Sequence, residues 1–189
     1  MTVLVAVTGA SGAIYADRAI AGLKARGVDV WATVSPTATV VARHELGVEP
    51  EALGAGGVER WFAHDDLSAP PASGSSCADA MLVIPCSMGT LGRIAAGTAD
   101  TLITRAADVC LKERKPLVLV PRETPLSLIH LRNLATVTEA GAVVLPACPH
   151  FYDRPTTVED VVGTVVGRAL VHLGVPGAEQ PRWCPDAPR

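Results

Sequence analysis

The chain opens with a strand, a turn of small residues and a helix, and this opening restricts the fold more than any other segment. The apolar run Val3–Val7 leads into the turn Thr8–Ala13, and a second apolar run, Val28–Val34, ends at Ser35 after the helix. Such a βαβ unit places backbone N–H groups and the positive end of a helix dipole where they can bind an anion. The pattern therefore predicts an α/β fold with a nucleotide phosphate at the turn.

The kind of nucleotide follows from what the turn lacks. An NAD-binding unit has Gly-x-Gly-x-x-Gly and, about 20 positions later, an acidic residue that holds a ribose hydroxyl. Here only Gly9 and Gly12 stand in the turn, and the second strand ends in the hydroxyl of Ser35. A hydroxyl can donate to a phosphate where a carboxylate would repel it, so a mononucleotide such as FMN fits better. The alternative is a tight turn that binds no ligand.

The alternation of apolar runs and helical segments continues along the chain. Further short apolar runs at 81–84, 117–120 and 142–145 are separated by helical segments. Continuous apolar strands between helices are typical of a parallel sheet covered on both faces. We therefore expect one α/β domain over residues 1–175, Rossmann-like and three-layered, with a mainly parallel sheet. The expected helices cover residues 14–26, 37–46, 91–95, 101–113, 126–140 and 158–173.

Composition limits the partners. The 189 residues are 49% hydrophobic and carry a net charge of −3 with both signs scattered, so neither a nucleic-acid stripe nor a basic membrane patch is expected. The five cysteines form no Cys-x-x-Cys pair, and the five dispersed histidines suggest no metal site. No apolar run approaches the roughly 20 residues that span a bilayer, and no basic segment precedes the first strand. We expect a cytoplasmic protein that binds small metabolites.

Two stretches interrupt this alternation of strands and helices. Residues 47–77 are rich in Gly, Pro, Ala and Ser, and so long a connection is more often a functional loop than a passive one. A linker between two domains is the alternative. After Gly174 the chain becomes rich in proline, and we expect residues 176–189 to form a tail that docks on a neighbour or stays mobile.

Polar residues follow all five expected strands. In an open parallel sheet a ligand binds beyond the carboxyl ends of the strands, near the point where the strand order reverses. Some of these residues also have an interpretation without a ligand. Ser87 or Thr90 alone could serve as a helix N-cap, and Arg122 could form a surface ion pair with Glu123. The residues at these strand ends are Gly9, Ala10, Ser11, Ser35, Ser87, Met88, Gly89, Thr90, Arg122, Glu123 and Tyr152.

Two further cations stand on helices. Lys112 lies in the last turn of the helix over 101–113, where a cation ordinarily complements the dipole. Arg168 falls at the edge of the buried stripe of the last helix, a position that is ordinarily a solvated flank. Ser11 lacks the Gly-x-Ser-x-Gly frame of a hydrolase nucleophile, so it is better placed to bind than to attack.

Several ordered motifs together resemble the UbiX/Pad1 family of flavin prenyltransferases, over about residues 3–175. The motifs are Thr8-Gly9-Ala10-Ser11-Gly12-Ala13-Ile14-Tyr15, Pro71-Ala72-Ser73-Gly74-Ser75, Pro85-Cys86-Ser87, Thr104-Arg105-Ala106-Ala107-Asp108-Val109, Leu111-Lys112-Glu113-Arg114, Pro121-Arg122-Glu123-Thr124-Pro125-Leu126, and Phe151-Tyr152 with Arg154-Pro155.

The resemblance implies a flavoprotein fold and a metal-independent transferase. Such an enzyme joins the dimethylallyl group of dimethylallyl phosphate to N5 and C6 of reduced FMN. It further implies a homo-oligomer, a dodecamer with active sites at subunit contacts, and a UbiD-type decarboxylase that receives the prenylated FMN. No metal, nucleic acid or membrane is implied.

The resemblance also assigns roles by position. It places Glu45 near the flavin as an acid of the family, and it places Arg105 and Glu123 in a polar ring that lies partly across a subunit boundary. The candidate catalytic groups are Glu45, Glu123 and Ser11. FMN would be held by Gly9, Ala10, Ser11, Ser35, Ser87, Met88, Gly89, Thr90 and Arg122, and the donor phosphate by Lys112, Arg122, Tyr152, Arg168 and Arg105.

The implied chemistry suits these residue types. Ionisation of an allylic phosphate leaves a delocalised cation and a phosphate whose growing charge needs fixed donors, which arginine, lysine and tyrosine supply. Two acceptors are open for the proton that C6 loses, the released phosphate and Glu123. Two departures bear on substrate preference, since Pro36 stands where many relatives have lysine and Leu67 where some have an aromatic residue.

Two other functions share this fold. One is an FMN-dependent decarboxylase of peptidyl-cysteine or phosphopantothenoylcysteine, whose Pro-Ala-Ser-Ala-Asn-Thr type motif is replaced here by Cys86-Ser87-Met88-Gly89-Thr90. The other is a carrier that binds FMN and releases it unmodified. A carrier does not require Lys112, Arg122, Tyr152 and Arg168 together.

Overall fold

The computed structural model describes residues 1–179. The strands are β1 (Thr2–Val7), β2 (Asp29–Val34), β3 (Arg60–Phe62), β4 (Ala80–Cys86), β5 (Leu117–Pro121) and β6 (Val143–Val144). The α-helices are α1 (Ala13–Lys24), α2 (Pro36–Leu46), α3 (Met88–Ala95), α4 (Leu102–Lys112), α5 (Leu128–Glu139) and α6 (Val158–His172). Two short 3-10 helices are η1 (Pro50–Ala55) and η2 (Pro70–Ala72).

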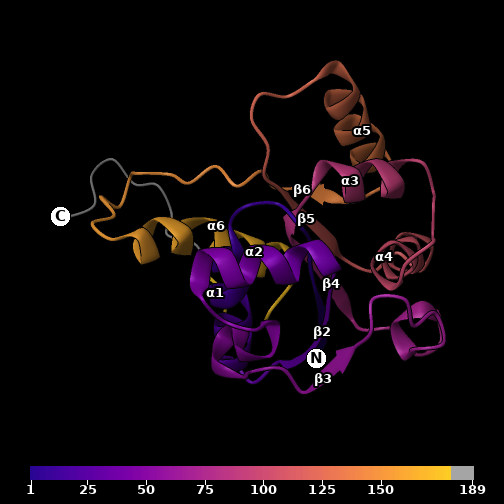
Figure 1. The fold of residues 1–189 in the computed structure, drawn as a ribbon, viewed down its shortest axis with the longest axis horizontal. Coiled ribbons are helices and arrows are strands. Elements are labelled where there is room, and N and C mark those ends of the chain that lie inside the picture. The colour runs from indigo at the N-terminus through magenta and orange to yellow at the C-terminus, as the bar shows by residue number, and fades with distance from the viewer. Residues whose placement is uncertain (180–189) are drawn as a thin grey trace.

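The strands form one parallel sheet between two helical layers (Figure 1). Their order is β3-β2-β1-β4-β5-β6, and every neighbouring pair is parallel. Helices α1, α2 and α6 contribute to the apolar cluster on one face, and α3, α4 and α5 to the cluster on the other. The expected three-layer, Rossmann-like α/β fold is confirmed.

Strand β1 shows why the strands are continuous apolar runs in the sequence. Successive side chains of a strand point to opposite faces of the sheet. Val3, Val5 and Val7 pack in the cluster of α1 and α6, whereas Leu4 and Ala6 pack in the cluster of α3 and α4. Because helices cover both faces, neither set of positions is open to polar residues.

Five of the six α-helices begin at a hydroxyl residue whose side chain accepts a backbone N–H of the first turn, as Ser and Thr favour at N-caps. Helix α1 differs, because Gly12 with φ 113° precedes it and supplies no side-chain cap. The first turn of α1 therefore needs a partner from elsewhere. The capping residues are Ser35 of α2, Ser87 of α3, Thr101 of α4, Ser127 of α5 and Thr157 of α6.

The connection from Gly47 to Cys77 is not one long irregular loop. It contains η1, η2 and the edge strand β3, which pairs with β2. The apolar pattern missed this sixth strand because its three residues, Arg60–Phe62, are too few to show a period. Since β3 extends the same sheet, the connection does not link two separate sheets. Of the tail expected over residues 176–189, residues 180–189 lie outside the part that the structure describes.

The strand order reverses between β1 and β4. The chain adds β2 and β3 on one side of β1, then returns to place β4 on the other side. In sheets of this kind the ligand crevice lies above the carboxyl ends of the strands at that reversal. The topology therefore directs attention to the loops that leave β1 and β4.

Backbone hydrogen bonds continue beyond the strand ends at this edge. They hold the loops of neighbouring strands in register with one another, so the loop positions follow from the sheet. The donor and acceptor pairs are Ser35 N–H to Val7 C=O (3.0 Å), Thr8 N–H to Pro85 C=O (3.2 Å), Arg122 N–H to Cys86 C=O (3.3 Å) and Ala147 N–H to Pro121 C=O (3.0 Å).

The burial of β4 gives a test of the core. Leu82 is 0% exposed, so Leu82→Ala leaves a cavity and we expect it to lower the free energy of unfolding by about 2–5 kcal/mol. Val40 on α2 is 62% exposed, and Val40→Ala should change the same quantity by less than about 0.5 kcal/mol. Denaturant unfolding followed by circular dichroism measures both. Similar losses in the two variants would contradict the arrangement of the core.

Candidate functional site

The loops that leave β1, β2, β4 and β5 meet at the carboxyl edge of the sheet. They bring together residues that the sequence assigns to a flavin, although these residues are spread over most of the chain. The strand reversal between β1 and β4 lies in the middle of the group. The residues at this edge are Gly9, Ala10, Ser11, Ser35, Ser87, Met88, Gly89, Thr90, Arg122 and Glu123.

Gly9 allows the turn after β1 to lie against the start of α2. A β-carbon at Gly9 would stand 2.4 Å from the methyl carbon Cγ2 of Thr37 and 2.6 Å from its Cβ, closer than packed atoms approach. The missing side chain therefore lets the Ser11 turn and the Ser35 cap come together. A larger residue at position 9 would push the two segments apart.

The carboxylate of Glu45, in the last turn of α2, caps the start of α1. Gly12 N–H donates to its two oxygens at 3.1 and 2.9 Å, and Ala13 N–H donates at 2.8 Å. The Ser11 hydroxyl also donates to this carboxylate. The negative charge of Glu45 thus lies at the positive end of the α1 dipole, where it is stabilised.

Opposing effects determine the pKa of Glu45. Partial burial raises the pKa, whereas the hydrogen bonds from Ser11, Ala13 and Gly12 and the nearby charge of Arg122 lower it. The lowering effects prevail together, and the pKa lies below its ordinary value. Glu45 is therefore ionised at neutral pH.

This cap changes the role expected for the turn after β1. The sequence predicted that the N–H groups at the start of α1 would bind a nucleotide phosphate, but those of Gly12 and Ala13 already bind Glu45. A phosphate at the same donors would meet a carboxylate of like charge. The sequence pattern could not show this, because Glu45 stands 33 residues after Gly12 and reaches it only when α2 folds back beside α1.

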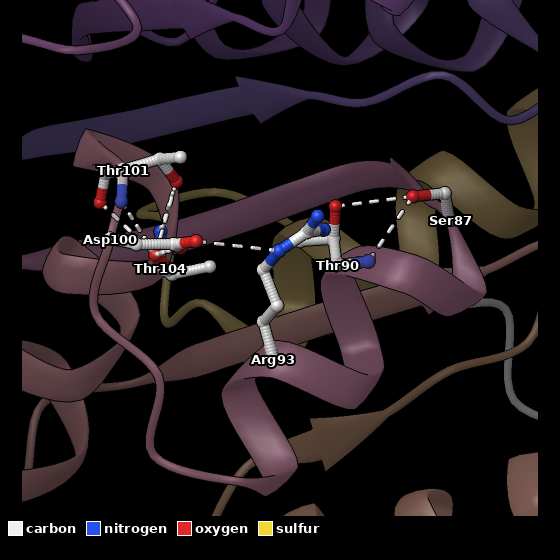
Figure 2. A network of polar contacts seen from close by, with 6 residues as sticks. All are labelled: Ser87, Thr90, Arg93, Asp100, Thr101 and Thr104. Atoms are coloured by element: carbon white, nitrogen blue, oxygen red, sulfur yellow. Dashed lines mark hydrogen bonds and ion pairs between the residues drawn. The ribbon is translucent and has the colours of Figure 1, made fainter.

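The start of α3 offers the donors that α1 does not. Ser87 Oγ accepts the N–H of Thr90 at 3.3 Å, and the two hydroxyl oxygens lie 3.1 Å apart (Figure 2). The N-cap interpretation of Ser87 is confirmed. Within residues 1–179 the N–H groups of Met88 and Gly89 have no protein acceptor, so an anion at this helix start would find two unused donors and a favourable dipole.

An ion pair that sequence reasoning did not single out joins α3 to the segment just before α4. Arg93 Nε lies 3.7 Å from Asp100 Oδ2, and the Thr104 hydroxyl donates to Asp100 at 3.3 Å (Figure 2). A β-carbon at Gly89 would stand 3.6 Å from a terminal nitrogen of Arg93, so the guanidinium reaches back to the start of α3. The pairing of Arg93 with Asp100 is the contact that only the three-dimensional structure shows.

Arg122 is electrostatically coupled to the β1 turn from the far side of β4. Burial and then the neighbouring Cys148 raise the pKa of Tyr15, while the charge of Arg122 lowers it. Arg122 also lowers the pKa of Glu45. Sequence reasoning did not single out Tyr15 or Cys148 as site residues. Motif position gave the only signal for Tyr15, and nothing in the sequence indicated Cys148.

Glu123, the neighbour of Arg122, turns back on its own loop. Its carboxylate oxygen Oε1 accepts the N–H of Thr124 at 2.9 Å. Among residues 1–179 it forms no ion pair with Arg122, so the surface pair that the sequence left as an alternative does not form. Both side chains are exposed at the carboxyl edge.

Lys112 lies at the opposite edge of the sheet. It ends α4 just before β5 begins, and it pairs with Glu113 beside Gly74, where a β-carbon would stand 2.8 Å from its Nζ. Arg122 follows the other end of β5. Five strand residues at about 3.3 Å each separate the two ends by roughly 15 Å. One copy of the chain does not bring Lys112 and Arg122 together.

Arg105, near the start of α4, is held by contacts with η2 and with its own helix. Its Nε donates to the carbonyl oxygen of Ala72 in η2 at 3.0 Å, and its guanidinium pairs with Asp108 at 2.5 Å. These contacts hold Arg105 on the side of α4 that packs against η2. Arg105 and Lys112 stand seven residues, or about two turns, apart on α4, so they share one face of that helix.

Tyr152 and Arg168 share a third region. Arg168 lines an open groove of about 510 Å³ between α6 and the loop after β6, and His150 of that loop lines the same groove. The ring of His150 lies 5.9 Å from the ring of Tyr152, which is 74% exposed. The loop and the helix together place a phenol and a guanidinium on one part of the surface.

The groups at the carboxyl edge suit FMN. Ser11 and Ser35 supply hydroxyls, Arg122 supplies a guanidinium, and the N–H groups of Met88 and Gly89 are unused. In residues 1–179 no group of three or more His, Cys, Asp or Glu side chains is arranged to hold a metal ion. None of the helices described is long and apolar enough to cross a bilayer.

Comparison with known proteins agrees with this site. The family model described as Flavoprotein matches residues 1–170. Flavin prenyltransferase UbiX of Methanothermobacter thermautotrophicus is 45% identical, over 96% of this chain and 94% of that protein. The solved structure of AnUbiX (PadA1) in complex with FMN and dimethylallyl pyrophosphate is 41% identical, with a TM-score of 0.91 and 97% of each chain covered. A dodecameric FMN-dependent UbiX-like decarboxylase from Escherichia coli O157:H7 is 40% identical, with a TM-score of 0.90 over 97% of this chain and 99% of that one.

The fold and the donors at its carboxyl edge define a flavoprotein. Its likeness to proteins of one activity extends over nearly the whole chain and far exceeds a likeness of fold alone. The chain belongs to the UbiX family of flavin prenyltransferases.

The Glu45 cap makes stability depend on pH. Folding lowers the pKa of Glu45, so its carboxylate adds to the free energy of unfolding. This contribution is complete above the unfolded pKa of about 4.5 and is lost as the pH falls through the folded pKa. We expect Glu45→Gln to lower the free energy of unfolding at neutral pH by about 1 kcal/mol or less, since solvent screens the exposed carboxylate. Thermal unfolding at neutral pH and at about pH 3 measures the difference in stability between the variant and the unmodified protein. This difference should disappear at the lower pH. A difference of equal size at both would contradict the charged cap.

Proposed function

We propose that the protein is a metal-independent transferase that joins the dimethylallyl group of dimethylallyl phosphate to N5 and C6 of reduced FMN. The observation that carries the proposal is the likeness to the FMN and dimethylallyl pyrophosphate complex, together with the hydroxyl, amide and arginine donors that this chain gathers at the corresponding edge of the sheet. The product, prenylated FMN, would pass to a UbiD-type decarboxylase.

The loops of the carboxyl edge would hold FMN. Reduced FMN supplies the electron-rich ring atoms that attack the allylic group. Gly9 and Ala10 let the backbone approach the ligand closely, and Ser35 donates from its hydroxyl. Ser11, whose hydroxyl hydrogen goes to Glu45, offers its oxygen as an acceptor to the ligand. The donors at the start of α3, from Ser87, Met88, Gly89 and Thr90, and the guanidinium of Arg122 complete the FMN site.

The cationic side chains would hold the phosphate of the second substrate. As the bond between phosphate and allylic carbon breaks, the phosphate gains negative charge, and fixed donors stabilise that charge most when water is excluded. Arg122 and Arg168 can each bind two oxygens at once, whereas Lys112 and Tyr152 each act through one atom. Arg105 completes the ring of donors.

Ser11, Glu45 and Glu123 would handle protons. Ser11 donates to the ionised carboxylate of Glu45, so this pair can take up a proton from the crevice through the hydroxyl. Glu123 is exposed on the loop beside Arg122 and accepts only a backbone N–H, which leaves its other oxygen available for a proton. The proton lost from C6 goes either to Glu123 or to the released phosphate.

A second copy of the chain would complete the active site. Lys112 lies beyond the amino end of β5, whereas Arg122 follows its carboxyl end, so Lys112 does not reach the crevice of its own chain. Arg105 is held against η2 by its contacts with Ala72 and Asp108. We infer that a neighbouring copy supplies Lys112 and Arg105. The dodecameric state of the Escherichia coli neighbour supports such an assembly, and a homododecamer is the state proposed here.

Helix α5 offers a surface for that assembly. Its first turns are apolar on the outside, with exposed fractions of 61% for Leu128, 68% for Ile129 and 49% for Leu131, and Leu126, just before the helix, is 43% exposed. Adjacent exposed aliphatic side chains of this kind mark a protein interface, because a solvated surface gains nothing from them. We assign this face of α5 to contacts between copies.

Two further proposals concern the whole chain. We propose that residues 1–175 form one FMN-binding domain, since a single sheet carries all the strands described. We also propose a cytoplasmic location. The supporting observations are the scattered surface charge and the absence of a membrane-spanning helix among the described residues.

Product analysis separates this function from the two alternatives. The protein is incubated without oxygen with reduced FMN and either dimethylallyl phosphate or dimethylallyl pyrophosphate, and the flavin is analysed by mass spectrometry. A flavin heavier by one five-carbon unit supports the transferase, and the two donors show which phosphate is accepted. Unmodified flavin with both donors would contradict it, and decarboxylation of a cysteine-containing substrate would favour the alternative enzyme.

Two arginine variants test the assigned roles. We expect Arg122→Ala to abolish prenylation and to weaken FMN binding, because Arg122 serves both ligands. Arg168→Ala should also abolish prenylation, a loss of at least about a hundredfold, yet leave FMN bound, since Arg168 serves only the phosphate. Flavin absorbance after purification reports FMN retention. Loss of flavin from Arg168→Ala would contradict its assignment.

The α5 surface predicts an assembly defect. Ile129→Glu places a charge in an apolar contact and should convert the assembly into smaller species, with a loss of activity, because Lys112 and Arg122 would no longer meet. Light scattering coupled to size exclusion measures the mass. Thr136→Glu, an exposed change later on the same helix, is the control and should leave the mass unchanged. An intact assembly in Ile129→Glu would contradict the role of this face.

A further inference from the structure

Thr8 follows the last residue of β1 and is 1% exposed, although it is polar. Its hydroxyl donates to the carbonyl oxygen of Pro85 at 2.7 Å and accepts the N–H of Ser87 at 2.7 Å. Its own N–H donates to the same Pro85 oxygen at 3.2 Å. One side chain of the β1 loop thus holds two residues at the end of β4, across the strand reversal.

The need for this side chain follows from Pro85. The parallel ladder between β1 and β4 ends with the pair Ala6 and Val83. Further along, Pro85 has no N–H to donate, so the backbone alone cannot continue a regular ladder there. The Thr8 hydroxyl takes over the connection and extends it to Ser87, which lies beyond the end of β4.

We propose that Thr8 is a positioning residue that fixes the FMN crevice by joining its two central loops, an inference that rests on the proposed function. Thr8 immediately precedes Gly9, Ala10 and Ser11 on one side. On the other side it holds the N–H of Ser87, the N-cap of α3. Thr8 itself does not touch either substrate in this proposal.

The link sets the direction of the α3 donors. With its backbone held by Thr8, Ser87 turns its hydroxyl to the N–H of Thr90 at 3.3 Å, which fixes the first turn of α3 (Figure 2). The unused N–H groups of Met88 and Gly89 belong to that turn. Without the Thr8 hydroxyl the helix start and the Gly9 turn would no longer share a fixed separation.

The fold does not depend on the same hydroxyl. Strands β1 and β4 remain paired through the four rungs from Val3–Ala80 to Ala6–Val83, all within the buried sheet. Removing the hydroxyl also leaves the Ser87 N–H without its acceptor, which weakens the loop locally. We therefore expect a larger effect on ligand binding than on the cooperative unfolding of the sheet.

Two substitutions at one position test the proposal. Thr8→Val keeps the shape and removes the hydroxyl, whereas Thr8→Ser keeps the hydroxyl. The dissociation constant for FMN, measured by quenching of flavin fluorescence, should rise at least tenfold in Thr8→Val and stay within threefold of the unmodified protein in Thr8→Ser. Hydrogen exchange of the peptide containing Ser87 should accelerate only in Thr8→Val. Thr8→Ala is a second variant without the hydroxyl, to be used if Thr8→Val does not fold.

Val3→Ala is the control for stability alone. Val3 is 0% exposed at the other end of β1, so its truncation lowers the unfolding temperature without touching the crevice. We expect it to leave the dissociation constant for FMN unchanged. The proposal is overturned if hydroxyl-free Thr8 variants bind FMN within twofold of the unmodified protein, or if Val3→Ala weakens FMN binding as much. These measurements do not depend on prenylation. If the unmodified protein fails to prenylate FMN, that result contradicts the proposed function and leaves the role of Thr8 in FMN binding to be decided by the binding data.

Discussion

The parallel pairing of β1 with β4 is the constraint on which the rest of this structure depends. It places the point of strand reversal in the centre of the sheet, and the loops of the proposed FMN site leave the sheet on either side of it. The pairing is buried on both faces by helices, so the loops are built on the closely packed core of the molecule. A flavin site assembled from small residues needs such support, because glycine and serine loops have little packing of their own.

The two helix starts beside this crevice carry different charges. The start of α1 already holds the carboxylate of Glu45, whereas the start of α3 keeps unused N–H donors and has Arg93 beside it. The two helix starts that face the reversal therefore differ in the charge they can accept. One presents an ionised acid with a hydrogen-bonded serine, which suits proton transfer, and the other suits an anionic ligand.

The division of cationic groups between the two edges of the sheet connects catalysis with assembly. Arg122 follows the carboxyl end of β5, and Lys112 precedes its amino end, so the strand itself keeps them apart within one copy. If phosphate binding needs both, activity requires contact between copies. The apolar outer face of α5 favours association between copies of the chain, because burying those side chains removes apolar surface from water.

The sequence by itself determined the fold class, most of the strands and the edge of the sheet where the candidate ligand residues lie, because continuous apolar runs and hydroxyl N-caps are local signals. It missed β3, which is too short to show a period, and it did not show that Glu45 caps the start of α1, where it predicted a phosphate. Only the tertiary structure decided that Glu45 occupies that helix start, that Thr8 joins β1 to β4, and that Lys112 and Arg122 stand at opposite edges. Each of these depends on contacts or separations between segments far apart in the chain, and no local pattern of residues encodes how such segments meet.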